Sequence, residues 1–363
     1  MKLLTVGDVV GEAGIDTLHA LLRRVKRAHG VDFVIVNGEN AAGRGLTPKQ
    51  ADDIFAAGAD VITLGNHAFA KQQIASYLDG RQDILRPANL APQSPGQGWG
   101  IYDGPQGLRL LVMNLIGRCD MHYGPDNPFL CADKILREAE GKYDIALAEI
   151  HANATSEKLA MGYYLDGRAA AVWGTHTHVQ TADERINPNG SGYITDLGMT
   201  GPIVSVLGVR VEQSIAMFRG DLTEYFKTAP GDCVLSGAVF DLARDGKCAS
   251  VTRVWERCAQ PQRRKIHWSE RRAAHDCNFS GPVLYPAQFV SGALDAALDG
   301  RVPSSVRHEG VPRGVYRGVC LDRVRAANRL LGSVAVSAAA VFAASRQLLV
   351  WLDAVSGAGG AGG

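Results

Sequence analysis

Five short polar clusters follow apolar segments of this sequence, and they contain side chains that can bind metal ions. In chain order they are Gly7-Asp8, Gly38-Glu39-Asn40, Gly65-Asn66-His67, His151 and Gly174-Thr175-His176-Thr177-His178. Carboxylate, carboxamide and imidazole groups together form a mixed oxygen and nitrogen donor set, which suits iron, manganese, cobalt or zinc. Magnesium and calcium prefer oxygen donors alone. The clusters therefore predict a transition-metal centre and make a magnesium-only site improbable.

Two such ions about 3.5–4 Å apart can hold a phosphate between them and lower the pKa of a bridging water, so the predicted chemistry is phosphoester hydrolysis. His176 and His178 are expected to point the same way, because they lie two residues apart on a segment that is expected to be extended. Asn66 and His67 are adjacent and are expected to point apart. One can then bind metal while the other, His67, meets the substrate as a candidate general acid.

Each cluster taken alone has a structural alternative. A Gly-Asp pair after a strand is a common turn, and Asn66-His67 could cap a helix. Five such clusters at strand ends in one chain favour a shared function, because the structural alternative requires five independent coincidences.

The elements that would position these clusters are short apolar strands. Strands are predicted at residues 3–6, 33–36, 61–64, 145–148 and 170–173, and helices at 15–28, 49–57 and 132–140. Strands that alternate with helices predict a largely parallel sheet, with the polar clusters gathered at one edge. Later strands at 192–196, 233–241 and 249–255 have little helix between them. The last two resemble a hairpin and indicate a second sheet packed on the first.

The composition of the 363-residue chain changes near Arg257. Residues 258–363 carry 13 Lys and Arg against 7 Asp and Glu, a net charge of +6, and leave −5 for residues 1–257. The second part is rich in Arg, Ala and Gly and has no sustained amphipathic period. We predict one globular domain, 1–257, followed by a basic, poorly ordered extension, 258–363. A small helical appendage and a membrane-associating segment are the alternatives for the extension.

The cellular setting is predicted from the cysteines and the N-terminus. Seven cysteines are scattered without a CxxC pair, and the N-terminus leads directly into a strand with no secretory signal. Both features predict a cytoplasmic protein with reduced thiols. The mildly acidic main domain argues against extended nucleic-acid contact, since that depends on many Lys and Arg. No firm membrane association is expected.

Longer strings of residues around the clusters resemble one family. They are Gly7-Asp8-Val9-Val10-Gly11, Asn37-Gly38-Glu39-Asn40-Ala41-Ala42, Arg86-Pro87-Ala88-Asn89, Ala154-Thr155-Ser156-Glu157-Lys158, Gly174-Thr175-His176-Thr177-His178-Val179-Gln180-Thr181-Ala182-Asp183 and Thr195-Asp196-Leu197-Gly198-Met199-Thr200-Gly201-Pro202. These strings resemble the YmdB-like bacterial branch of the calcineurin-like metallophosphoesterases, and the resemblance covers residues 1 to about 257.

The resemblance implies an α/β fold, a two-sheet α/β/β/α sandwich, with a dinuclear centre that often contains iron or manganese, zinc and cobalt also being compatible. It implies phosphodiesterase activity on small substrates, with 2′,3′-cyclic nucleotides favoured, by attack of a metal-bound hydroxide at phosphorus. It is also compatible with a homo-oligomer. Carried over motif by motif, one ion would be held by Asp8, Glu39, Asn40 and His178. The other would be held by Glu39, Asn66, His151 and His176, with Glu39 bridging and His67 as the acid.

Two departures from the family pattern bear on turnover. The branch usually carries an acid where this chain has Ala70, and an Asp where it has Glu149. The loss of the acid near His67 favours a rival interpretation, a metal-dependent regulatory protein that senses a nucleotide with little turnover. A nuclease acting on RNA ends is a third alternative. All proposed metal ligands are retained, so metal binding is the firmer expectation.

Overall fold

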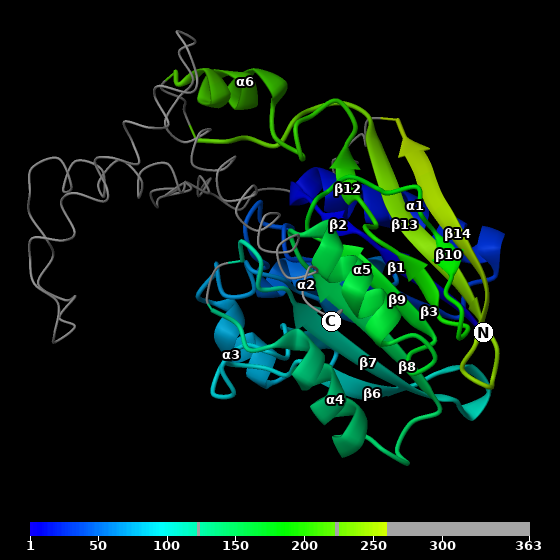
Figure 1. Ribbon diagram of the computed structural model, residues 1–363. Coiled ribbons are helices and arrows are strands. Elements are labelled where there is room, and N and C mark those ends of the chain that lie inside the picture. Colours follow the sequence, from blue (N-terminus) through cyan, green and yellow to red (C-terminus); the bar gives the residue numbers. More distant parts are fainter. Residues whose placement is uncertain (122–123, 222–224, 260–363) are drawn as a thin grey trace, which may run out of the picture. The chain divides into compact units, whose positions relative to one another are not determined.

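Two β-sheets lie face to face, with helices on the outer face of each (Figure 1). A computed structural model describes residues 1–121, 124–221 and 225–259 of the chain. The predicted two-sheet α/β/β/α sandwich is therefore confirmed within these residues. The predicted extension, 258–363, lies outside them except for its first two residues. No helix among the described residues is long and apolar enough to cross a membrane.

The first sheet contains eight strands within the described residues. They are β1 (Lys2–Val6), β2 (Asp8–Val9), β3 (Phe33–Asn37), β4 (Val61–Thr63), β5 (Ile84–Leu85), β12 (Met199–Pro202), β13 (Cys233–Leu242) and β14 (Cys248–Cys258). Their order is β2-β12-β13-β1-β3-β4-β5, with β14 paired to β13. The strands β1, β3, β4 and β5 are parallel, while β13 runs antiparallel to β1.

The second sheet contains six strands in the described part of the chain. They are β6 (Trp99–Asp103), β7 (Arg109–Ile116), β8 (Ile145–His151), β9 (Ala171–Thr175), β10 (Arg185–Ile186) and β11 (Gly192–Ile194). The central strands β7, β8, β9 and β11 are parallel, and the edge strands β6 and β10 are antiparallel to their neighbours. The hairpin predicted from residues 233–241 and 249–255 exists, but it extends the first sheet and does not start the second. Its first strand, β13, pairs with β1 from the other end of the described sequence. Local sequence does not indicate such a pairing.

The described residues also form helices, most of which pack on the outer faces of the sheets. They are α1 (Gly11–His29), α2 (Pro48–Ala57), α3 (Ile74–Asp79), α4 (Pro128–Glu138), α5 (Thr155–Tyr164) and α6 (Val211–Arg219), with a short 3₁₀ turn η1 (Pro105–Gly107). Helix α2 is capped at its start, because the Thr47 side chain accepts a hydrogen bond from the backbone of Gln50 and Pro48 begins the helix. Helix α4 begins before the predicted residue 132, because Asn127 caps it and Pro128 occupies its first position.

The alternation of side chains along each strand builds the layers. Leu3 and Ile35 point into the core between the two sheets, whereas their neighbours Leu4 and Val34 pack under the helices of the first sheet. In the second sheet, Leu111 packs on the outer side with α4 and α5. Both faces of each central strand are buried, which explains why the strands are continuous apolar segments.

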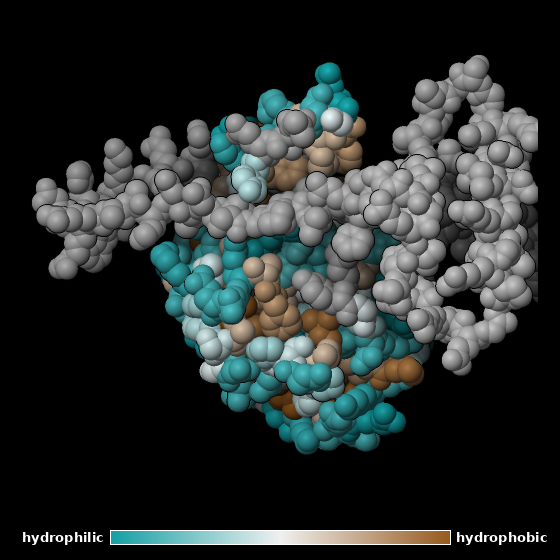
Figure 2. All heavy atoms as spheres, turned by 90° about the vertical axis from the view of Figure 1, so that its left-hand side faces the viewer, coloured by the Kyte–Doolittle hydropathy of each residue, from teal (hydrophilic) through white to brown (hydrophobic). Residues whose placement is uncertain are grey.

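The described surface in Figure 2 is mainly hydrophilic, with smaller apolar areas between the polar ones. Several of the exposed apolar side chains belong to the segment around α6, where Val204 is 74% and Phe218 is 80% exposed. Most apolar residues therefore lie between the two sheets or between a sheet and its helices. The polar clusters lie at the ends of the strands.

Candidate metal centre

The five polar clusters lie at the carboxyl ends of parallel strands from both sheets. Asp8 follows β1, Glu39 and Asn40 follow β3, and Asn66 and His67 follow β4 in the first sheet. In the second sheet His151 is the last residue of β8, and His176 and His178 follow β9. Because the sheets pack face to face, the ends of their parallel strands bring these side chains together.

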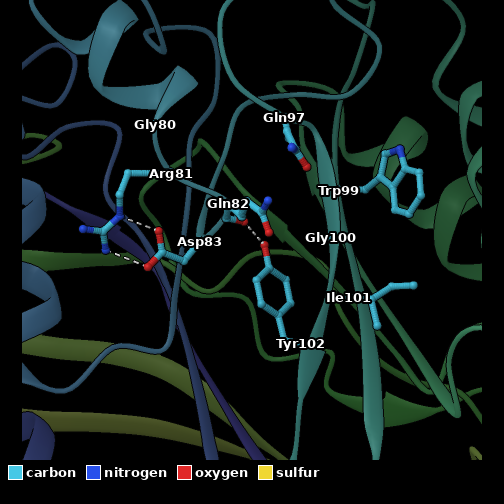
Figure 3. A pocket seen from close by; sticks show the side chains of 9 residues that line it. All are labelled: Gly80, Arg81, Gln82, Asp83, Gln97, Trp99, Gly100, Ile101 and Tyr102. Atoms are coloured by element: carbon cyan, nitrogen blue, oxygen red, sulfur yellow. Dashed lines mark hydrogen bonds and ion pairs between the residues drawn. The ribbon is translucent and has the colours of Figure 1, made fainter.

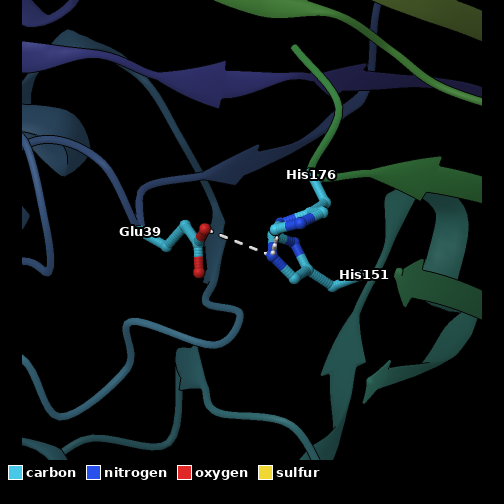
Figure 4. Close-up of side chains that lie close together, drawn as sticks. All are labelled: Glu39, His151 and His176. Atoms are coloured by element: carbon cyan, nitrogen blue, oxygen red, sulfur yellow. Dashed lines mark hydrogen bonds and ion pairs between the residues drawn. The ribbon is translucent and has the colours of Figure 1, made fainter. Parts of the chain in front are cut away.

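Glu39, His151 and His176 form the centre of the cluster, and Figure 4 shows their side chains pointing toward one another. The Nε2 atom of His151 is 3.2 Å from Oε1 of Glu39 and 3.0 Å from Nδ1 of His176. The same nitrogen lies 2.9 Å from Oδ1 of Asn66. Four potential ligand groups therefore surround one position.

Asp8, Asn40 and His178 form an adjoining group. Nε2 of His178 is 3.3 Å from Oδ1 of Asn40 and 3.9 Å from Oδ1 of Asp8. Nδ1 of His178 is 3.2 Å from the Leu207 carbonyl oxygen, which can only accept, so the ring presents its other nitrogen to Asp8 and Asn40. The backbone N–H of His176 donates to Oδ2 of Asp8 at 3.2 Å and connects the two groups.

The Oδ1 atom of Asp8 is buried and has no hydrogen-bond partner among the described residues. A carboxylate oxygen held out of water without a donor is costly. The imidazole and amide groups around it can supply lone pairs as well, so a cation is the ligand that this donor set fits. The residues present therefore fit the metal centre that the sequence predicts.

Burial and close charges shift the pKa values of the ligand groups in different directions. Burial raises the pKa of Asp8 to about 6, and the nearby Glu39 adds to that rise while His178 and His151 oppose it. Burial also opposes the charge of Glu39, but its pair with His151 outweighs burial and holds the pKa of Glu39 well below its usual range. Burial lowers the pKa of His176 to about 3, with help from His151, so its imidazole is neutral at pH 7.

His67 lies beside Glu39 and Asn66. Its backbone N–H donates to Oε2 of Glu39 at 3.1 Å, and its Nε2 is 3.4 Å from Nδ2 of Asn66. Burial lowers the pKa of the His67 ring, Glu39 opposes this, and the charge of Arg44 adds to the lowering. The ring is therefore a stronger acid when protonated, and it holds its proton only at lower pH.

Two local predictions about these clusters are wrong. Residues 65–70 form tight turns, in which the N–H of Ala68 donates to the Gly65 carbonyl, so the side chains of Asn66 and His67 lie side by side. Likewise, His176 and His178 are not on an extended segment, because β9 ends at Thr175.

His176 has a φ of 98° and His178 a φ of 63°, both in the region that non-glycine residues rarely adopt. The residue between them, Thr177, donates from its backbone N–H and its hydroxyl to Oδ2 of Asp196, at 3.1 and 2.7 Å. This contact holds the turn that directs the two imidazoles to different groups.

The glycine that permits the closest packing at the centre is Gly65. A Cβ atom there would collide with the ring of His151 and the carboxylate of Glu39. At Gly174, in the fifth cluster, a Cβ atom would instead meet the backbone of Thr195. Gly174 therefore serves the packing beside β9, and Gly65 lets the backbone approach the ligands.

Sequence reasoning assigned no role to the buried polar residues behind the ligands. Glu149 lies within β8, and Lys158 and Asp196 form a buried ion pair at 2.6 Å. Glu149 interrupts an apolar strand, and Asp196 lies at the end of another predicted strand. A charged residue at such a position was the available signal.

A hollow of about 470 Å³ lies between the residues that lead into β5 and strand β6 (Figure 3). None of its lining residues belongs to the predicted site. Its charged groups, Arg81 and Asp83, pair with each other at 2.6 Å, and the hydroxyl of Tyr102 donates to the Gln82 carbonyl. The hollow therefore lacks a convergent set of unpaired groups for catalysis.

The sequence model of the family described as YmdB-like protein matches residues 4–254. The chain belongs to the YmdB-like protein family. It is 46% identical over 243 residues to the 2′,3′-cyclic-nucleotide 2′-phosphodiesterase of Bacillus subtilis (strain 168), an alignment that covers 67% of this chain and 91% of the relative. The resemblance inferred from the strings of residues is confirmed.

Solved structures agree with this assignment. A phosphatase from Mycoplasma pneumoniae superposes with a TM-score of 0.67 at 34% identity, covering 72% of this chain and 95% of its own. A hypothetical protein from Thermus thermophilus gives a TM-score of 0.65 at 36% identity, covering 71% of this chain and 99% of its own. The YmdB-like chain is therefore a metallophosphoesterase by family and by fold.

Proposed function

We propose that this YmdB-like protein is a dinuclear metal-dependent phosphodiesterase that hydrolyses small phosphodiesters, with 2′,3′-cyclic nucleotides as its main substrates. The observation that carries the proposal is the convergence of seven potential ligands from two sheets, one of them a buried carboxylate oxygen on Asp8 without a partner in the described part of the chain. The activity for which the Bacillus subtilis relative is named supports the substrate class.

The two groups of side chains support one ion each. Asp8, Glu39, Asn40 and His178 would hold one, and Glu39, Asn66, His151 and His176 would hold the other, with Glu39 shared. Iron or manganese is proposed first, and zinc or cobalt also suits the donors. When bound, such ions neutralise phosphate charge and activate water for attack at phosphorus.

The chain's own acid is proposed to be His67. Opening a cyclic phosphate adds water, breaks one phosphorus–oxygen bond and requires a proton for the departing ribose oxygen. His67 stands beside the shared ligand Glu39, where a protonated ring can supply that proton. The lowered pKa of His67 makes it a stronger acid and confines the protonated form to lower pH.

The rival proposal is a nucleotide sensor with little turnover. It is favoured by Ala70, which is exposed, lies three residues after His67 and brings no acid to it. A sensor needs ligand binding but not proton delivery, so replacing His67 by Ala separates the two functions. The enzyme loses hydrolysis with its metal content intact, whereas the sensor keeps its biological output.

The primary test is metal analysis of the purified full chain, followed by a screen of phosphomonoesters, linear diesters and cyclic nucleotides. We expect two transition-metal ions per chain and hydrolysis of cyclic nucleotides to monoesters. Weak dependence of the rate on salt would support small substrates over RNA ends. Protein that contains no metal and cannot be reconstituted would contradict the proposal. A cytoplasmic location and a homo-oligomeric state remain expectations from sequence.

A further inference from the structure

Glu149 is a buried carboxylate that lies behind the proposed metal centre, and its hydrogen bonds are to residues other than the proposed ligands. It is 1% exposed, and it accepts four hydrogen bonds from uncharged donors. Oε1 accepts from Nδ2 of Asn37 at 2.7 Å and from the hydroxyl of Thr175 at 2.8 Å, and Oε2 accepts from the hydroxyl of Thr63 at 2.7 Å and from Nε1 of Trp173 at 3.1 Å.

These contacts come from both sheets. Glu149 and Thr175 belong to the neighbouring parallel strands β8 and β9, while Asn37 and Thr63 are the last residues of β3 and β4 in the other sheet. Among the described residues, none of these hydrogen-bond donors to Glu149 is a cation. Burying a carboxylate with neutral donors alone is unfavourable compared with an apolar side chain. A role at the adjacent site accounts for its presence.

The direction of the hydrogen bonds connects Glu149 to His151. A threonine hydroxyl has a single hydrogen, and Thr175 donates it to Glu149. The oxygen of Thr175 can then only accept from Nδ1 of His151, which lies 2.9 Å away. Thr175 is the register partner of His151 in the parallel pair β8–β9, so the sheet itself fixes this contact.

We infer that Glu149, through Thr175, keeps a proton on Nδ1 of His151 and thereby directs the Nε2 lone pair toward the metal centre. The inference rests on the proposed function, because directing Nε2 serves the protein only if the site binds metal. Nε2 is the atom that lies near Asn66, Glu39 and His176. Glu149 and Thr175 are positioning residues, because they act through His151 and do not touch the site themselves.

The test uses Thr175→Val, which keeps the shape of the side chain and removes its hydroxyl. Thr63→Val is the matched control, because it removes another hydroxyl from the same Glu149 carboxylate and leaves the Thr175–His151 contact in place. Thr175→Ser restores the hydroxyl and is the rescue variant. The probe is Zn²⁺, which is diamagnetic, added to metal-free full-length protein labelled with ¹⁵N-histidine.

Two readouts separate the hydrogen-bond relay from Glu149 through Thr175 to His151 from a merely structural effect. Zinc affinity is expected to fall about 10–100-fold in Thr175→Val, as for other residues that orient a metal-bound histidine, and to stay near wild type in Thr63→Val and Thr175→Ser. In the zinc-loaded wild type, the ¹⁵N shifts of His151 are expected to show hydrogen on Nδ1 and metal on Nε2. In the metal-free protein the Nδ1 proton should be protected from exchange, and this protection should be lost in Thr175→Val.

The inference is overturned if Thr63→Val and Thr175→Val weaken zinc binding equally, since the carboxylate would then serve packing alone. An unprotonated Nδ1 in the wild type overturns it as well. If the metal-free protein shows the protected Nδ1 proton but binds no metal, the relay stands and the proposed metal function fails. The two failures are therefore distinguishable.

Discussion

Replacing Lys158 by Met is expected to lower the free energy of unfolding by about 3–5 kcal/mol, the range for removing one partner of a buried ion pair. The Lys158 side chain is 1% exposed, that of Asp196 is 0% exposed, and Nζ lies 2.6 Å from Oδ2. Met fills a similar volume but carries no charge. The variant leaves the Asp196 carboxylate buried without its cation.

The expected loss lies near the lower end of that range, because Asp196 keeps other donors. Oδ2 still accepts from the N–H and hydroxyl of Thr177, and Oδ1 accepts from the N–H of Gly198 at 2.8 Å. A loss of about 3 kcal/mol is still large beside the roughly 5–15 kcal/mol that typical domains have in total. Because Thr177 lies between His176 and His178, we also expect weaker metal binding.

The assay is denaturant unfolding of the metal-free protein, with the zinc dissociation constant measured separately. Lys49→Met is the matched control, since Lys49 pairs with Asp53 at 2.7 Å on the surface of α2 with 82% of its side chain exposed. A pair of that kind contributes less than about 1 kcal/mol. If the free energies of unfolding of Lys158→Met and Lys49→Met differ by less than about 1 kcal/mol, the buried pair does not hold the turn as we argue.

Three further predictions concern the site. Replacing His67 by Ala should lower kcat for cyclic nucleotides about 10²–10⁴-fold with metal content unchanged by elemental analysis, and an unchanged kcat would remove His67 from the mechanism. The pKa of Asp8 is raised to about 6, so below that pH its carboxyl is protonated and must release a proton to bind metal. Metal affinity should therefore fall up to about tenfold per pH unit below pH 6, as calorimetry can measure, and a flat profile would contradict this. Removing metal with a chelator should lower the free energy of unfolding. Adding metal at about 100 times its dissociation constant should raise that free energy by about 2.7 kcal/mol, measured by denaturant unfolding. No gain would argue against a site built from both sheets.

The strands and the polar clusters were predictable because each depends on local sequence. Runs such as Phe33 to Val36 are short, branched and apolar, and the residues after them are donors for metals. Which strands pair was not predictable to the same extent. Strand β13 joins β1 from the far end of the described sequence, so the hairpin was predicted in the wrong sheet.

The orientation of the ligands was less predictable than their identity. The expected extended conformation at His176 fails because Asp196, distant in sequence, binds Thr177 and bends the chain. At Asn66 the backbone turns on itself, and a contact between neighbouring side chains replaces the expected separation. In both places a tertiary hydrogen bond or a tight turn outweighs the strand pattern from which the expectation came.

The strained and buried features around the centre follow from a single requirement. Ligands from two separate sheets must meet within a few ångströms, yet strands end at fixed spacings, so the connecting backbone has to bend sharply. On one side, the backbone bends at His176, which has a positive φ, and the buried Asp196 holds the bend by accepting a hydrogen bond from Thr177. On the other side, Glu149 receives donors from both sheets and fixes the ring of His151. Charges that would be unfavourable in an ordinary core therefore lie where the backbone and the ligand rings need an anchor.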